Sequence, residues 1–249
     1  MEKQAGNLFA KVTIFVAATG RCTAVLPIPV PSMSAHRQPS RIHCLTFNPF
    51  QENTYVVAAP NGDCVIIDPG CYEAREEQAL ERLIEREGLK PVRLLNTHAH
   101  LDHILGNAFV TERWNLKPEL HRADHDLLRA APVYSEAWGI RLTPSPEPGA
   151  FLEEGDWIRF GGVEFRVLFT PGHCPGHVVF YNEAEGYVIG GDVLFQRSIG
   201  RTDLPGGDHA QLLSSIREKL FTLPDATVVW PGHGPETTVG EERVENPFL

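Results

Sequence analysis

Three histidines and one aspartate fall within six consecutive residues, in the segment His98-Ala99-His100-Leu101-Asp102-His103. Residues 92–96 before it predict a short buried strand, and residues 104–114 after it have apolar side chains at helical spacing. The segment is therefore expected on a strand-to-helix turn, at the carboxyl end of a sheet, where α/β folds place their ligands. Neutral imidazole and carboxylate are the ligands of zinc and its divalent neighbours. The sequence thus predicts a metal site on this turn.

A turn this short offers too few ligands for two ions, so residues further along the chain must contribute. Three candidates follow strand-like apolar runs and have glycine or proline neighbours, as is typical where a strand ends in a site loop. They are His173, Asp192 and His233.

These motifs resemble those of the metallo-β-lactamase fold superfamily, which has His-x-His-x-Asp-His and then a single His, a single Asp and a single His. The matching positions follow the family order over about 135 residues. The resemblance implies an α+β or α/β fold, a four-layer αββα sandwich, over residues 41–249. It also implies two divalent ions, with zinc as the first candidate and iron or manganese as alternatives. Their ligands would be His98, His100 and His173 for one ion, Asp102, His103 and His233 for the other, and Asp192 as a bridge.

Asp68, in Asp68-Pro69-Gly70, matches a further motif of the family, an aspartate that supports the metal loop without touching the metal. An aspartate that only caps a turn is the alternative interpretation. Asp68 is therefore left out of the predicted ligand set.

The resemblance implies a hydrolase whose nucleophile is a hydroxide that bridges the two metals, with Asp102 as a ligand that also orients it. Residues 193–203 and 231–243 look like those of single-domain, glyoxalase II-like hydrolases, which act on thioesters such as S-lactoylglutathione. True β-lactamases instead have a cysteine where Asp192 stands. A small-molecule thioester is therefore the expected partner.

One departure from the family concerns the thiol carrier. Only 16 residues follow His233, and full-length glyoxalase II carries a C-terminal helical domain that holds glutathione. We therefore expect thioester hydrolysis with weak discrimination between carriers. Arg201 could bind a substrate carboxylate, or it could be a buried arginine that pairs with Asp203.

The rival function from another class is a persulfide dioxygenase, an oxidoreductase that the segment Gly200-Arg201-Thr202-Asp203 also resembles. Such an enzyme would hold a single iron with two histidines of the set and Asp192. The segment Gly232-His233-Gly234-Pro235 argues against it, because that branch usually has different residues on either side of this histidine.

Composition excludes other classes. The formal charge of −10, without a local basic run, disfavours nucleic acid as a partner, and no apolar run is long enough to span a membrane. The cysteine count is odd, with no Cys-x-x-Cys pair, which favours a reducing, cytoplasmic location. Cys174 is predicted to be an inert thiol, and His121 and His125 are predicted to lie outside the metal site. Oligomeric state is left open.

The remaining chain alternates predicted strands and helices. Residues 1–40 are predicted to be a disordered or targeting extension, with Met33 as an alternative start. Helices are expected at 73–87, 104–114, 124–138 and 209–221, the last with Asp208 and Gln211 forming a capping box. Strands are expected at 42–47, 54–59, 65–67, 92–96, 118–121, 157–160, 163–169, 178–181, 187–189 and 227–230.

Overall fold

Two six-stranded β-sheets organise residues 38–249, the part of the chain that the computed structural model describes. The predicted extension over residues 1–40 lies outside that part except for its last three positions. The first sheet contains, in spatial order, β1 (Arg41–Phe47), β2 (Glu52–Ala58), β3 (Asp63–Ile67), β4 (Lys90–Leu95), β5 (Pro118–His121) and β6 (Ala150–Leu152). The second contains β14 (Thr237–Thr238), β13 (Val228–Pro231), β10 (Tyr187–Gly191), β9 (Val178–Asn182), β8 (Val163–Phe169) and β7 (Trp157–Phe160).

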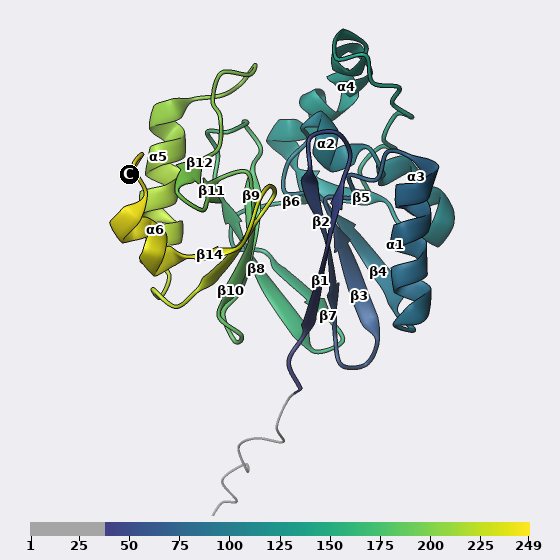
Figure 1. The fold of residues 1–249 in the computed structure, drawn as a ribbon, viewed down its shortest axis with the longest axis horizontal. Helices are drawn as coiled ribbons and strands as arrows, with labels where there is room; N and C mark the ends of the chain where they lie inside the picture. Colours follow the sequence, from purple (N-terminus) through teal and green to yellow (C-terminus); the bar gives the residue numbers. More distant parts are fainter. Residues whose placement is uncertain (1–37) are drawn as a thin grey trace, which may run out of the picture. The chain divides into compact units, whose positions relative to one another are not determined.

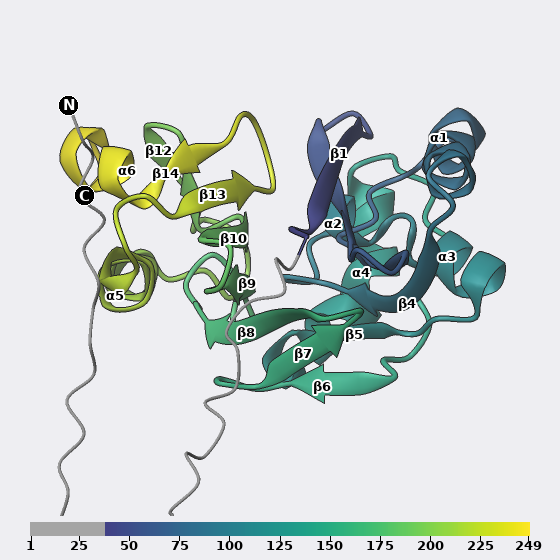
Figure 2. The ribbon, with the colours of Figure 1, turned by 90° about the horizontal axis from the view of Figure 1, so that it is seen from below.

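Helices cover the outer faces of both sheets, as Figures 1 and 2 show from two directions. The helices are α1 (Ala74–Arg86), α2 (Leu101–Ile104), α3 (Asn107–Trp114), α4 (His125–Ala137), α5 (His209–Glu218) and α6 (Val239–Glu245). The remaining elements are the 3-10 turns Arg122–Asp124 and Leu220–Thr222 and the small sheet of β11 (Leu194–Phe195) and β12 (Ser198–Ile199). None of the helices in residues 38–249 is long and apolar enough to cross a membrane.

Three apolar clusters define the layers. One lies between the sheets and includes Tyr55, Phe165 and Phe180. A second joins the first sheet to α1 and α3, and a third joins the second sheet to α5 and α6. The sheets are therefore buried on both faces, and the predicted αββα sandwich is confirmed.

Most predicted elements are found within a few residues of their expected bounds. Asn61-Gly62, a typical hairpin dipeptide, connects β2 and β3, which pair antiparallel, and Gly62 has a φ of +89°. The small β6, β11, β12 and β14 and the helix α6 had no counterpart in the prediction.

Two helix predictions need correction. The helix expected over 104–114 is split into α2 and α3 at Leu105 and Gly106. Gly106 lies so close to Cys71 and Pro69 that a Cβ there would overlap them, so tertiary packing sets the break. The helix expected over 209–221 ends at Glu218 and continues as a 3-10 turn. At its start Asp208 accepts from the Gln211 amide at 3.0 Å, but the Asp208 amide donates to the Gly172 carbonyl, so the capping box is only half formed.

The loops that carry the predicted ligands all lie at one edge of the sandwich. They follow β4, β8, β10 and β13, and backbone hydrogen bonds tie the two sheets together there. The Val178 amide donates to the Thr97 carbonyl at 2.8 Å, and the Asn53 amide donates to the Gly232 carbonyl at 2.7 Å. Backbone hydrogen bonds thus fix the loop after β4 to β9 and the loop after β13 to β2.

Candidate metal centre

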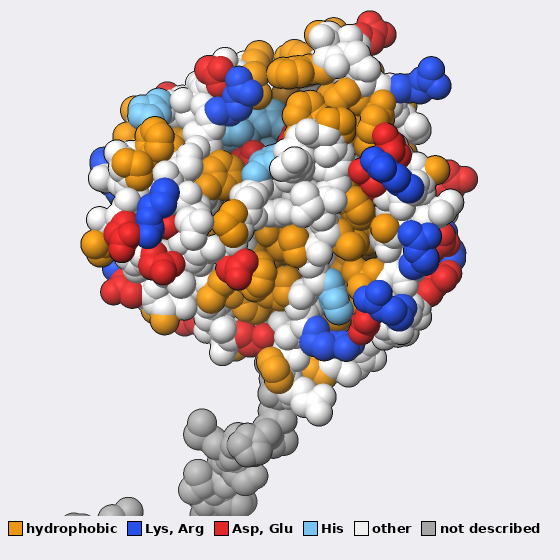
Figure 3. Space-filling view, viewed as in Figure 1, with side chains coloured by type: hydrophobic (Ala, Val, Ile, Leu, Met, Phe, Trp, Pro, Cys, Tyr) orange, Lys and Arg blue, Asp and Glu red, His pale blue; other side chains and the backbone are white. Residues whose placement is uncertain are grey.

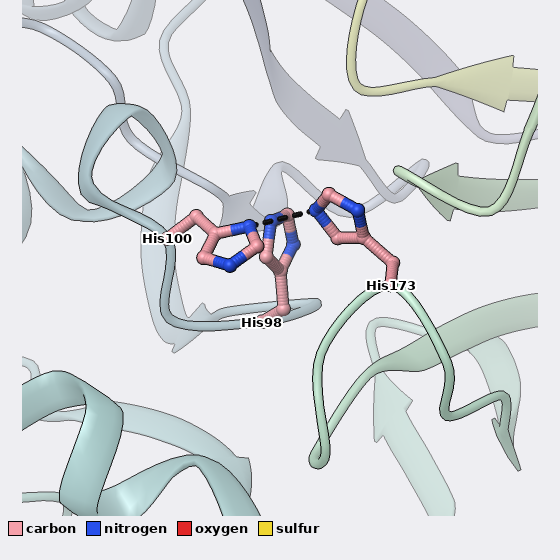
Figure 4. Close-up of side chains that lie close together, drawn as sticks. All are labelled: His98, His100 and His173. Carbon is pink, nitrogen blue, oxygen red and sulfur yellow. Dashed lines mark hydrogen bonds between the residues drawn. The ribbon is translucent and has the colours of Figure 1, made fainter. Parts of the chain in front are cut away.

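The structure brings all seven predicted ligands together at this edge. Two three-residue groups have ligand atoms within 4.8 Å of one another: His98, His100 and His173, and Asp102, His103 and His233. Asp192 lies between the groups. Its Oδ1 is 3.4 Å from His103 Nε2, and its Oδ2 is 3.5 Å from both His173 Nε2 and His233 Nε2. Figure 4 shows the first group, with two rings from the loop after β4 and one from the loop after β8.

Asp68 orients two of the histidines. Its Oδ1 accepts from the Thr97 amide at 2.7 Å, and its Oδ2 accepts from the Thr97 hydroxyl at 2.6 Å. Because that hydroxyl proton is used, Thr97 Oγ1 can only accept from His98 Nδ1, 3.0 Å away. His103 Nδ1 donates to Asp68 Oδ2 at 3.1 Å. Both rings therefore carry a proton on Nδ1 and turn Nε2 toward the cluster, and metal-binding histidines commonly donate their other ring N–H in this way to a carboxylate or an oxygen.

Backbone carbonyls orient two more rings. His173 Nδ1 donates to the Arg201 carbonyl at 2.7 Å, and His233 Nδ1 donates to the Phe50 carbonyl at 3.1 Å. A carbonyl oxygen can only accept, so the proton is on Nδ1 in both rings. Their Nε2 atoms face Asp192. Four histidines thus commit Nδ1 to partners around the cluster and turn Nε2 toward one space.

Unpartnered buried atoms test whether metal ions fit. Within residues 38–249, His98 Nε2, His103 Nε2 and Asp192 Oδ1 are buried and have no hydrogen-bond partner, and His100 turns Nδ1 toward His173 Nε2, 2.7 Å away. Such groups are rare in native proteins because each lost hydrogen bond costs about 1–3 kcal/mol. Coordination of divalent cations by these imidazole and carboxylate atoms would satisfy them. The donor set therefore fits two ions.

The same geometry explains why residue 232 is a glycine, and it distinguishes the two possible roles of Asp68. Gly232 approaches Asp192 and His103 so closely that a Cβ would overlap Asp192 Oδ1. Asp68 also lies within 4.8 Å of His98 and His103 in a third possible group. Both of its oxygens are already used by Thr97 and His103, however, which favours the predicted supporting role.

The two groups differ in their electrostatics. Burial lowers the pKa of His98 well below its ordinary value, and that of His100 to about 3. Burial also acts on His103 and His233, but the carboxylates of Asp192 and Asp102 outweigh it and raise the pKa of both rings. The first group is therefore made of neutral imidazoles, whereas the second pairs imidazoles with carboxylates.

Three buried residues near the site had no predicted role. His177 accepts from the Asp192 amide through Nε2 at 3.0 Å and stacks on His98. Asp124 accepts from the Ala99 amide at 2.9 Å and the Gly176 amide at 2.5 Å, so it joins the loops after β4 and β8. Glu52 is fully buried, with Oε1 unpartnered 3.9 Å from His103 Nδ1. The repeat Gly172-His173 and Gly176-His177 was a sequence signal for His177.

The other singled-out residues are placed as follows. Arg201 pairs with Asp203 through two hydrogen bonds of 2.7 and 2.8 Å, but both side chains are exposed, so the buried pair considered above is wrong. Cys174 is buried and donates to Asp124, and burial raises the pKa of its thiol, which fits an inert role. His121 stacks on Phe169 and His125 bonds Glu147 at 2.8 Å, and neither joins a group of ligand-type residues.

A cavity of about 400 Å³ opens onto the cluster. Its floor includes His100, Asp102, His173, Asp192 and His233. Figure 3 shows pale blue histidine side chains at the bottom of a hollow whose border is largely hydrophobic. A small molecule can therefore reach the predicted ligands from solvent.

Comparison with known proteins agrees with this geometry. Residues 47–233 match the profile of the Metallo-beta-lactamase superfamily. The chain is 42% identical over 202 residues to the "Probable metallo-hydrolase YqgX" of Bacillus subtilis, a match that covers 81% of this chain and 93% of that protein. It is 36% identical over 219 residues to the hydroxyacylglutathione hydrolase GloC of Haemophilus influenzae, covering 84% and 97%.

Two solved structures are similar over nearly their whole length. The BLEG-1 B3 metallo-β-lactamase superposes with a TM-score of 0.78 at 39% identity, covering 84% of this chain and 99% of that one. TTHA1623 in a di-iron-bound form superposes with a TM-score of 0.75 at 43% identity, covering 83% and 100%. The fold therefore has close counterparts among solved structures.

Proposed function

This chain belongs to the metallo-β-lactamase superfamily, and on that premise we propose that it is a hydrolase of thioesters of the S-lactoylglutathione type that uses two divalent metal ions. The observation that carries the proposal is the set of four histidines whose Nδ1 protons are committed to Asp68, Thr97 or backbone carbonyls. The Nε2 atoms of three of them, His103, His173 and His233, lie 3.4–3.5 Å from the carboxylate of Asp192, which lines a solvent-accessible cavity.

His98, His100 and His173 would hold one ion, Asp102, His103 and His233 the other, and Asp192 would contact both. When bound, such a pair of ions polarises a substrate carbonyl and makes a water molecule nucleophilic near neutral pH. The overall reaction breaks the carbon–sulfur bond, forms a carbon–oxygen bond and yields a carboxylic acid and a thiol.

The protein's own groups would orient the reactants. Asp102 lines the cavity, and its Oδ2 is held 3.1 Å from His233 Nε2. A carboxylate fixed in this way can accept a hydrogen bond from the attacking water and take its proton. Asp102 is therefore the proposed catalytic residue.

Two comparisons support details of the proposal. GloC, a hydroxyacylglutathione hydrolase by name, aligns with this chain along nearly its whole length, which supports thioesters as the substrate class. TTHA1623 is known in a di-iron form, so iron stands beside zinc as a candidate metal. Imidazole and carboxylate ligands suit both.

The dioxygenase alternative is less well supported by the geometry. A single iron in a facial triad needs three protein ligands, and the Asp102, His103 and His233 group would then have no ion to bind. BLEG-1, a B3 metallo-β-lactamase by name, makes β-lactam hydrolysis the second candidate activity. β-Lactam hydrolysis also requires the attack of water on a carbonyl group.

The test combines metal content with three assays on one preparation. The protein is loaded in turn with zinc, iron and manganese, and each form is assayed with three substrates. Thiol release is measured with S-lactoylglutathione, ring opening with a β-lactam, and oxygen uptake with glutathione persulfide. We expect about two ions per chain and the highest kcat/KM for the thioester. Oxygen uptake with one iron per chain, or ring opening faster than thiol release, would contradict the proposal.

A further inference from the structure

The walls of the cavity above the metal centre are apolar. Phe50, Leu127 and Trp138 line it on the side of α4, and Phe195 and Leu204 line it on the side of β11 and the loop that follows β12. We call these five residues the apolar wall. A cavity of about 400 Å³ lies within the roughly 300–1,000 Å³ range of small-molecule sites. It has room for more than a three-carbon acyl group.

Charged groups are almost absent from the lining outside the proposed ligands. Arg201 is the one such residue among the described residues that line the cavity. Its guanidinium already forms a two-bond pair with Asp203, with both side chains more than half exposed. Asp203 occupies Nε and Nη2, so a substrate carboxylate would meet mainly the Nη1 edge of a guanidinium whose charge is already paired. The two carboxylates of glutathione therefore find no unpaired cation in the lining.

Part of the apolar wall is exposed to solvent. Trp138 is 56% exposed, and its ring lies edge-to-face on Phe50 with centroids 5.8 Å apart. Tyr134, one turn earlier, is 38% exposed and also lines the cavity. Large apolar side chains gathered at the rim of a cavity are typical of a surface that a ligand covers.

We propose that the substrate is a thioester carrying an apolar group of four or more carbons, which packs against the apolar wall. This inference rests on the proposed thioesterase function and deepens it. Each methylene that moves from water onto the wall should raise kcat/KM about fourfold until the wall is covered. S-Lactoylglutathione, with a small hydroxylated acyl group and a charged carrier, would then be hydrolysed, but with a lower kcat/KM than longer apolar thioesters.

Two substrate series test the proposal with the metal-loaded full chain. In the first, glutathione is kept and the acyl group is lengthened from acetyl through butanoyl and hexanoyl to octanoyl, with lactoyl included. In the second, the acetyl group is kept and the thiol is lengthened from ethanethiol to hexanethiol. We expect kcat/KM to rise about 10²-fold along at least one series. A flat response in both, or a preference for S-lactoylglutathione over every longer ester, would overturn the proposal.

A pair of tryptophan variants tests whether the dependence of kcat/KM on chain length comes from the apolar wall. Trp138→Ala should lower the ratio of kcat/KM between the longest and the shortest ester of the responding series about 10-fold. Trp157→Ala is the matched control, because Trp157 is 44% exposed on β7 and does not line the cavity. It should leave the ratio unchanged. Equal ratios in Trp138→Ala and the parent protein would contradict the assignment.

Two further measurements separate this inference from the function on which it rests. Leu127→Ala, on the opposite end of α4 from Trp138, should lower the same ratio, and metal content and unfolding temperature are recorded for every variant. If no thioester of either series is hydrolysed at full metal loading, the proposed function fails. If short and long esters are hydrolysed equally well, only the apolar specificity fails.

Discussion

The two groups of candidate ligands face the same cavity but differ in depth and charge. His98 and His173 are essentially inaccessible to solvent, whereas the side chains of Asp102 and His233 are 17% and 28% exposed. Burial keeps the pKa of His98 and His173 low, while carboxylates raise the pKa of His103 and His233. One group is therefore a buried set of neutral imidazoles, and the other is a more open set that includes an anion.

This difference suggests that the two groups of ligands have different roles. Neutral buried imidazoles suit an ion that stays bound, since they need lose no proton to coordinate it. The open group contains Asp102, the residue that we place closest to the attacking water. It should therefore exchange its ion more readily and respond more directly to the substrate.

The largest effect is expected from Asp192→Ala, which removes the contact between the groups. Asp192 approaches His173 on one side and His103 and His233 on the other, so both ions lose a ligand and the charge between them. We expect metal content well below one ion per chain and a fall in kcat of at least about 10³-fold, beyond the roughly 10–100-fold effect of outer-shell partners. Elemental analysis and thiol release measure both. Two ions retained in the variant would show that Asp192 is not a bridge.

Partial metal removal should separate the groups in a second way. With increasing chelator, the ion of the Asp102, His103 and His233 group should leave first, because two of its three ligands are partly exposed. Metal content should then fall in two steps, and thiol release should be lost with the first. The assignment of steps is checked with His233→Ala, which should remove the first step only. If both ions were released together in a single step, the two groups would not differ in how firmly they hold their ions.

Asp68→Asn should weaken both groups to a similar extent, because Asp68 holds His103 directly and His98 through Thr97. An amide in its place presents donors to Thr97 and His103, which are themselves donors. We expect metal affinity to fall about 10–100-fold for both ions, measured by competition with a chromogenic chelator. Asp126→Asn, at an exposed position of α4, is the control. Loss confined to one group would mean that Asp68 supports only one loop.

The sequence predicted that the seven candidate ligands would lie together, because each of them stands next to a local pattern that places it at the end of a strand. His98 to His103 form one segment, and His173, Asp192 and His233 each follow an apolar strand at a glycine. Local pattern is sufficient for such residues, since strand ends of two packed sheets meet at one edge. The αββα arrangement itself came from the family resemblance, because periodicity does not specify how strands are ordered.

The supporting residues were missed because their roles depend on contacts between distant segments. Asp124 joins Ala99 to Gly176, and the Arg201 carbonyl fixes the tautomer of His173. No local sequence pattern shows that a backbone carbonyl will accept a hydrogen bond from a candidate ligand histidine. The break at Gly106 was missed for the same reason, since it is set by packing on Pro69 and Cys71. Tertiary context overrides local propensity at such positions.

A smaller effect is expected from His177→Phe, which tests only the hydrogen bond that holds the backbone of Asp192. Phenylalanine retains a ring next to His98 but leaves the Asp192 amide without its acceptor, 3.0 Å away in His177 Nε2. We expect metal affinity to fall about 10-fold, the lower end of outer-shell effects. His209→Phe, at an exposed position where α5 begins, is the matched control. Unchanged affinity in His177→Phe would show that Asp192 is held without this bond.

The smallest effect is expected from Cys174→Ala, even though Cys174 adjoins His173. Its thiol points to Asp124 Oδ2, 3.1 Å away, and Asp124 keeps its bonds from Ala99 and Gly176 when the thiol is removed. Metal content should therefore be unchanged. Loss of a buried hydrogen bond of about 1 kcal/mol should lower the unfolding temperature by about 2–4 °C, measured by calorimetry. Alkylation of the native protein should reach exposed Cys44 before Cys174, whose pKa is raised by burial and by Asp124. If Cys174→Ala stripped metal from the first group, the thiol would belong to the ligand set, and the description of that group as imidazoles alone would be wrong.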